Sequence, residues 1–251
     1  MHISIRRATS RSRSGPGEVK RILFIGFVLS LLSSQLAVAE SSPTVIYWDS
    51  PAGRVIRARM PADADYWQLI PNFSVQMTQS YCSVASAITV LNSMPIKKPV
   101  DPTYAPYAYF TQSNFFTPEV SGVIGAETVL KMGMTRDEMV GTLRRQGVEA
   151  TSIAGDSIST DELRSLLKKA LVDDGQFVLA NYLRATLDQV GGGHWSALAA
   201  YDEATDRVLI LDVAKYKYAP AWVEVATLKN AINTLDTTSN RTRGLVIVST
   251  K

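Results

Sequence analysis

The order in which helical and strand-like patterns follow one another is the feature that most constrains the fold of this chain. Four segments carry apolar residues at helical spacing, over residues 82–94, 126–132, 136–146 and 160–171. Pro95 ends the first segment, and Thr135 with Glu138 forms a capping-box pattern before the third. Four strand-like runs follow, over residues 177–183, 195–201, 207–213 and 244–249. Helices first and antiparallel strands afterwards predict an α+β domain.

A β-hairpin is expected ahead of the first helix. Residues 45–48 and 55–58 contain Val and Ile pairs, which favour strands. The Asp-Ser-Pro-Ala-Gly segment at 49–53 has the composition of a turn. The sequence therefore predicts two short strands joined by this turn.

The first 39 residues have the three parts of a secretory signal peptide. They begin with a basic region that holds six Lys and Arg residues and one acidic residue, Glu18. An apolar run covers residues 22–36, and Ala37-Val38-Ala39 has the small-x-small pattern of a cleavage site. The alternative is an uncleaved membrane anchor, but this run is shorter than the ~20 apolar residues that span a bilayer. We therefore expect a cleaved signal peptide, export to the bacterial periplasm, no stable membrane association afterwards, and one domain over residues 40–251.

The charge of the chain gives no support for a nucleic-acid partner. The whole chain has 26 Lys and Arg against 23 Asp and Glu, and the leader holds six of the former and one of the latter. The remainder carries 20 against 22, so the basic character belongs to the leader. We find no basic patch of the kind that binds nucleic acid.

Cysteine and histidine are scarce enough to be informative. The chain has one cysteine, Cys82, and two histidines, of which His2 lies in the leader and His194 does not. A lone cysteine in an oxidising compartment forms no internal disulfide, so it is either a buried structural residue or a reactive one. Its expected place at a helix N-terminus favours the reactive alternative, because the helix dipole there stabilises a thiolate.

His194 and Asp212 lie at similar distances from the polar loop at residues 202–206. If that loop joins two antiparallel strands symmetrically, the two side chains face each other about 5 Å apart. A carboxylate in that position orients an imidazole as a general base. The alternative is that a one-residue bulge sends them to opposite faces.

Several motifs now resemble those of the phytochelatin synthase family, in the family's order and over about residue 66 to the end. The segment around the cysteine is Gln76-Met77-Thr78-Gln79-Ser80-Tyr81-Cys82-Ser83-Val84-Ala85-Ser86. The others are Tyr104-Ala105-Pro106-Tyr107, Asn181-Tyr182-Leu183-Arg184, Gly192-Gly193-His194-Trp195-Ser196, the stretch 209–220 and Thr242-Arg243-Gly244. The likeness is greatest to the short prokaryotic members.

The resemblance implies a papain-like catalytic domain over residues 40–251. It implies Cys82 as nucleophile, His194 as base, Asp212 as the orienting carboxylate and Gln76 as an oxyanion donor. Glutathione or a related γ-glutamyl thiol peptide would be the substrate. No cofactor or bound metal would be required, and the resemblance leaves room for activation by heavy-metal ions or a metal-thiolate substrate. Family analogy suggests a homodimer.

Four further residues are assigned more loosely. Arg184 and Arg243 are either substrate-carboxylate binders or members of buried ion pairs, since arginine suits both roles. Asn181 and Tyr182 are placed near the site and treated as substrate-binding candidates.

Two departures from the family pattern affect the expected activity. Thr78 and Ser83 replace residues expected to be Asn and Gly beside the nucleophile. The chain also has no cysteine-rich C-terminal region, which favours hydrolysis of glutathione or its S-conjugates over phytochelatin synthesis. Two alternatives stay open: a peptidase or amidase of another specificity, and a non-enzymatic protein that binds metal or thiol peptides.

Overall fold

A computed structural model describes residues 43–251 of the chain. The predicted signal peptide, with its Ala37-Val38-Ala39 exit, lies outside the described residues. Between residues 43 and 251, every helix is too short or too polar to cross a bilayer.

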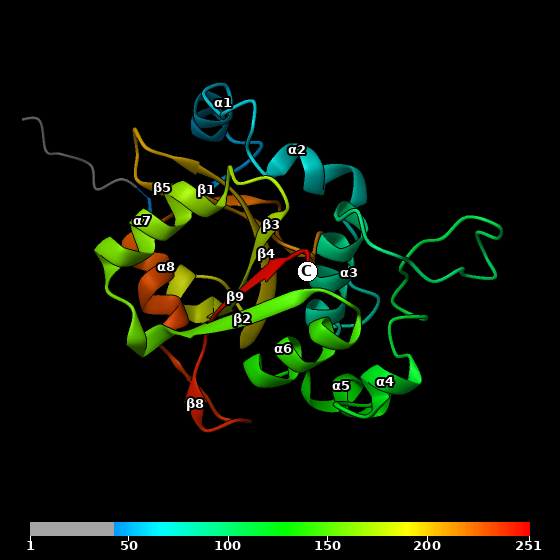
Figure 1. The fold of residues 1–251 in the computed structure, drawn as a ribbon. Helices are drawn as coiled ribbons and strands as arrows, with labels where there is room; N and C mark the ends of the chain where they lie inside the picture. Colours follow the sequence, from blue (N-terminus) through cyan, green and yellow to red (C-terminus); the bar gives the residue numbers. More distant parts are fainter. Residues whose placement is uncertain (1–42) are drawn as a thin grey trace, which may run out of the picture. The chain divides into compact units, whose positions relative to one another are not determined.

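Most helices lie in the first half of the described chain and most strands in the second, as the colours of Figure 1 show. The helices are α1 (Pro51–Arg57), α2 (Tyr66–Leu69), α3 (Cys82–Ser93), α4 (Pro118–Ser121), α5 (Ala126–Met132), α6 (Arg136–Arg145), α7 (Thr160–Ala170) and α8 (Val225–Ile232). Short 3-10 turns cover Ile70–Asn72, Gly155–Ser157 and Arg184–Leu187. The strands are β1 (Val45–Tyr47), β2 (Glu149–Ala154), β3 (Gln176–Leu183), β4 (Gly193–Asp202), β5 (Arg207–Leu211), β6 (Ala221–Glu224), β7 (Leu235–Asp236), β8 (Arg241–Thr242) and β9 (Gly244–Ser249).

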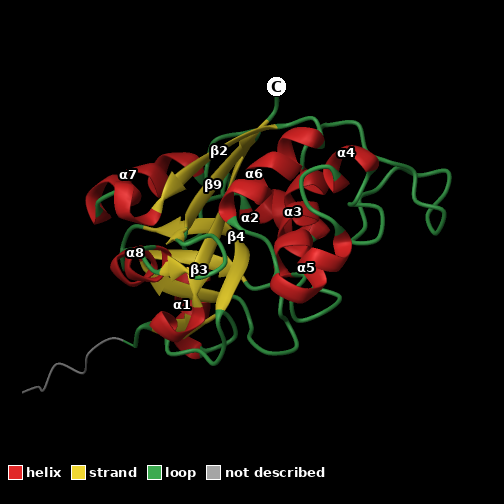
Figure 2. Cartoon of the chain, turned by 90° about the horizontal axis from the view of Figure 1, so that it is seen from below, coloured by secondary structure: helices red, strands yellow, loops and turns green. Residues whose placement is uncertain are grey.

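Seven of these strands form one sheet in the order β1-β6-β5-β4-β3-β9-β2, and every neighbouring pair is antiparallel. Figure 2 shows helices on both faces, with α7 and α8 on one side and α3 and α6 on the other. A hydrophobic core lies on each face of the sheet, and successive side chains of β3 point into one or the other. Phe177 and Leu179 pack in the core on the α3 side, and Val178 and Ala180 pack in the core on the α7–α8 side. The expected α+β class is confirmed.

The four predicted helices are all present. Helix α3 begins at Cys82, and eleven of its twelve residues are buried, including the polar Ser83, Ser86, Thr89 and Asn92. Thr135 and Ser159 each cap a helix through a reciprocal capping box with the glutamate three residues on. Local capping and helical periodicity therefore agree with the packed structure.

The predicted hairpin over residues 45–58 is wrong in its second half. Strand β1 pairs with β6, Val45 opposite Val223, and residues 51–57 form helix α1. Ser50 is the N-cap, its Oγ accepting from the Gly53 N–H, and Pro51 is at the first helical position. A Ser-Pro pair suits a helix start as well as a turn, because proline has no N–H to leave unpaired there.

Candidate active site

Cys82 stands at the first turn of α3, where that helix packs against β4. The helix and strand are joined by a 3.1 Å hydrogen bond that the Ser86 hydroxyl donates to the Trp195 carbonyl. Cys82 is 7% exposed. Burial raises the pKa of the thiol, but the charge of His194, a hydrogen bond with His194 and backbone hydrogen bonds from Trp195 and Ser83 outweigh burial and lower it. The site therefore favours a thiolate.

The expected contact between His194 and Asp212 is present. His194 Nε2 lies 2.9 Å from Asp212 Oδ1, and both side chains are buried. Burial lowers the pKa of His194, whereas the Cys82 thiolate and Asp212 raise it, and the net direction is upward. Burial raises the pKa of Asp212, but hydrogen bonds and charges from His194 and Arg184 hold it well below its usual range. The three groups thus shift one another's pKa values toward the charged forms.

A bulge, which the alternative reading held would separate these two residues, is present and brings them together. It lies between Leu198 and Ala200, and beyond it Leu198 pairs with Ile210. Continued to the strand ends, that register places Asp212 diagonally across from His194 on the same face. The loop between the strands is not symmetric. Without the bulge, the register at Ala200 would therefore continue to the strand ends and place the two residues on opposite faces of the sheet.

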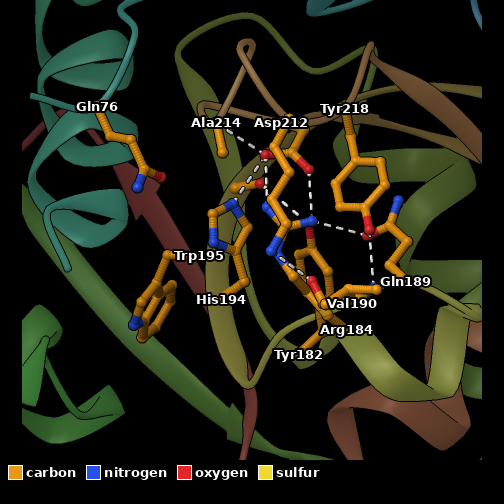
Figure 3. Close-up of polar contacts among 12 residues, drawn as sticks. Gln76, Tyr182, Arg184, Gln189, Val190, His194, Trp195, Asp212, Ala214 and Tyr218 are labelled. Carbon is orange, nitrogen blue, oxygen red and sulfur yellow. Dashed lines mark hydrogen bonds and ion pairs between the residues drawn. The ribbon is translucent and has the colours of Figure 1, made fainter. Parts of the chain in front are cut away.

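Arg184 forms a buried ion pair with Asp212, as the dashed lines of Figure 3 show. Its two terminal nitrogens donate to the two carboxylate oxygens at 2.7 and 2.8 Å, and it also donates to Gln189 Oε1 at 2.7 Å. The guanidinium carbon lies 5.1 Å from the centre of the Tyr218 ring. Of the two roles left open for Arg184, the structure therefore shows the buried ion pair.

Asn181 and Tyr182 follow one another on β3 and occupy different surroundings. Tyr182 pairs with His194 across the strands, and their rings meet edge to face at 5.6 Å between centroids. Its hydroxyl lies 3.3 Å from Ser196 Oγ. The Tyr182 ring thus packs against the His194 ring, whereas Asn181 lines the cavity beside Cys82.

That cavity has a volume of about 180 Å³ and holds a pair of opposite charges. Arg243 donates to Asn181 Oδ1 at 2.9 Å, and its other terminal nitrogen lies 3.9 Å from Asp236. Arg243 is 9% and Asp236 8% exposed. Burial lowers the pKa of Arg243, and the nearby charge of Asp236 opposes this. Cys82 lies in the wall of the same cavity.

Asp236 was missed at the sequence level. It belongs to the two-residue strand β7, which pairs with β8 and turns the chain back to Arg243. Its spacing of seven residues from Arg243 carries no motif, and only the hairpin brings the two together. Thr237 and Thr238 of the same hairpin also line the cavity.

Gln76 lies on the other side of His194, in a second cavity of about 210 Å³ that includes Arg184, Tyr216 and Lys217. Its backbone N–H donates to the Val213 carbonyl at 3.0 Å, which ties the segment before α3 to the segment that follows β5. Its side chain is 5% exposed, and Nε2 donates to the Thr78 carbonyl at 2.8 Å and to Tyr216 Oη at 3.0 Å.

No three His, Cys, Asp or Glu side chains among residues 43–251 are grouped so that they could hold a metal ion. The acidic and imidazole groups of the site are engaged with arginine and with one another.

Comparison with known proteins identifies the family. The family model for phytochelatin synthase matches residues 38–245. Glutathione gamma-glutamylcysteinyltransferase 1 of Triticum aestivum is 30% identical over 84% of this chain and 42% of its own length. The enzyme named glutathione gamma-glutamylcysteinyltransferase from Schizosaccharomyces pombe is 22% identical over 80% of this chain and 48% of its own.

The chain thus spans less than half the length of these two relatives. A solved double glycine motif protease from an AMS/PCAT transporter is 13% identical, covers 70% of this chain and 89% of its own, and has a TM-score of 0.38. This structural likeness is too slight to assign a fold. The sequence match over residues 38–245 does assign the family, and the chain belongs to the phytochelatin synthase family.

Proposed function

We propose that this chain cleaves the Cys–Gly peptide bond of glutathione, or of its S-conjugates, through a thioester on Cys82, in a domain of papain-like fold. The observation that carries the proposal is the buried Arg243–Asp236 pair in the cavity that Cys82 also lines. The γ-glutamyl end of glutathione carries both an α-carboxylate and an α-ammonium group. A guanidinium and a carboxylate at 3.9 Å offer one partner to each of them.

The resting charges suit the first chemical step. The Cys82 thiolate attacks the carbonyl carbon of the substrate cysteine, and the carbonyl oxygen becomes an oxyanion. The C–N bond to glycine then breaks, and the His194 imidazolium gives its proton to the leaving glycine nitrogen. The γ-glutamylcysteinyl group stays on Cys82 as a thioester, and Asp212 stabilises the positive histidine before that transfer.

The oxyanion needs donors that face the reacting carbonyl. We assign this role to the Gln76 amide and to the Cys82 backbone N–H at the start of α3, where helix N–H groups are free of intrahelical partners. Each such donor contributes about 3–4 kcal/mol to the transition state in a related case.

The thioester has two fates. Water attack releases γ-glutamylcysteine, whereas attack by the amine of a second glutathione extends the chain to a phytochelatin. We propose that hydrolysis dominates in this chain. Incubation with glutathione, with and without cadmium, distinguishes the two, because cadmium supplies the metal-thiolate form of the substrate; mostly phytochelatin in either reaction would contradict hydrolysis.

The test of the proposal is glycine release from glutathione by the reduced protein spanning residues 40–251. We expect glycine and γ-glutamylcysteine from the wild type and neither from Cys82→Ser. Arg243→Met should raise KM for glutathione by about 10- to 100-fold, the value of a lost charged hydrogen bond. Arg241→Met is the matched control, since that arginine is exposed on the same hairpin and pairs with Asp137.

Two results would redirect the proposal. Cleavage of other peptides with no glycine release from glutathione would keep the nucleophile and change the substrate. Equal effects of Arg243→Met and Arg241→Met on KM would show that the γ-glutamyl end of glutathione does not bind in the cavity that Asp236 lines.

A further inference from the structure

Both N–H groups of the Gln76 side chain have acceptors in the free protein. A primary amide nitrogen has two hydrogens, and Nε2 donates one to the Thr78 carbonyl at 2.8 Å and the other to Tyr216 Oη at 3.0 Å. The orientation of the amide is set by Thr78, because its carbonyl can only accept and would repel Oε1. Within residues 43–251, Oε1 is buried without a hydrogen-bond partner.

This arrangement leaves the Gln76 amide no free N–H to donate to a substrate oxyanion. A donor that already has an acceptor must release it before it can stabilise developing charge on the substrate. One of the two contacts must therefore open during the reaction.

The two contacts differ in how easily they open. Thr78 follows Gln76 by two residues, and the Gln76 backbone is itself fixed by the 3.0 Å bond to Val213. Tyr216 comes from the segment after β5, and its side chain is 61% exposed. Water can replace the partner of an exposed hydroxyl at little cost. The Thr78 carbonyl is part-buried and also accepts from the Tyr81 N–H at 3.2 Å, and its place two residues from the fixed Gln76 backbone keeps it beside the amide.

We infer that the Tyr216 hydroxyl occupies the oxyanion position of the free enzyme and must leave it when the substrate carbonyl arrives. Tyr216 is in this sense a positioning residue that competes with the substrate for one N–H of Gln76. It lines the same cavity as Gln76 and His194. The inference rests on the proposed oxyanion role of Gln76.

The backbone allows this movement without disturbing the site. The neighbouring lysines are anchored separately, Lys215 to the Phe73 carbonyl at 3.1 Å and Lys217 to the Val190 carbonyl at 2.6 Å. The Lys217 N–H also donates to the Ala214 carbonyl at 2.7 Å. Only the Tyr216 side chain has to rotate.

Tyr216→Phe tests the inference, since it removes the hydroxyl and keeps the ring. We expect the single-turnover rate of Cys82 acylation by glutathione to rise about three- to tenfold, the range of one net neutral hydrogen bond. The same substitution in a Gln76→Ala background should have no effect, because no N–H is left to release. Tyr107→Phe is the control, on a tyrosine that is 77% exposed and lies in neither cavity beside His194.

Two further readouts separate this role from a structural one. Alkylation of Cys82 by iodoacetamide forms no oxyanion, so its rate should be equal in wild type and Tyr216→Phe. Acylation by p-nitrophenyl acetate does form one, as the thiolate displaces p-nitrophenolate, so it should show the same rise even if glutathione proves not to be the substrate. An unchanged or lower acylation rate in Tyr216→Phe, or an equal rise in the Gln76→Ala background, would overturn the inference.

Discussion

Asp65 allows the sharpest quantitative prediction from this structure. Its side chain is 1% exposed, and within residues 43–251 neither carboxylate oxygen has a hydrogen-bond partner. Burial, and then the charges of Asp173 and Asp174, raise its pKa to about 8 from the ordinary 3.8. The folded protein therefore holds this carboxyl protonated over a pH range in which the unfolded chain has it ionised.

The sign and size of the effect follow from proton linkage. Between pH 5 and 7 the folded state binds one more proton at this position than the unfolded state does, so the free energy of unfolding falls as pH rises. The slope is about 1.4 kcal/mol per pH unit, or about 2.7 kcal/mol over this window. The contribution is most favourable below the unfolded pKa and levels off above about 8.

Asp65→Asn removes the ionisable group and keeps the shape of the protonated acid. Urea unfolding of the wild type and the variant at pH 5, 6 and 7 should show the variant gaining about 1.4 kcal/mol relative to wild type with each unit. Asp63→Asn, on an exposed aspartate two residues away, should leave the slope unchanged. Parallel curves for wild type and Asp65→Asn, within about 0.5 kcal/mol over the window, would refute the reasoning.

Three further outcomes follow from the site. Arg184→Met should destabilise the fold by about 3–5 kcal/mol in urea, because Asp212 would be left as a buried, uncompensated charge; a loss no larger than that of Arg241→Met would contradict this. Cys82 should react with iodoacetamide at pH values below the ordinary thiol pKa of about 8.5, since the effect of His194 outweighs burial and lowers its pKa, and in the urea-unfolded chain this low-pH reactivity should be lost. Gly193→Ala should raise KM for glutathione as Arg243→Met does and leave alkylation unchanged, because its Cβ would lie 2.2 Å from the Arg243 Nη1 atom and displace the guanidinium; an unchanged KM would contradict this.

Local signals in the sequence identified the helices well. Thr135 with Glu138 predicted a real helix start, and the apolar run after Cys82 predicted α3, because both depend on residues a few positions apart. The segment after Ser50 misled because turn composition and helix-start composition overlap. Strand β1 could not be assigned a partner locally, since β6 lies far along the chain.

The candidate site was predictable to the extent that it depends on scarce residue types. Cys82 and His194 stand out by count, and Asp212 by its distance from the loop. The role of Arg184 was ambiguous because guanidinium groups suit buried pairs and substrate carboxylates equally, and only its contact with Asp212 decided it. Asp236 reaches the site through the short β7–β8 hairpin, which leaves no periodic pattern to detect.

The central claim is that glutathione acylates Cys82, and intact-protein mass spectrometry tests it most directly. Reduced protein spanning residues 40–251 would be mixed with glutathione and quenched in acid within seconds. We predict a mass increase of one γ-glutamylcysteinyl group, mapped to Cys82 and absent from Cys82→Ser, together with an equal amount of free glycine in the first turnover. Glycine release without any adduct on Cys82, or equal release by Cys82→Ser, would contradict the account.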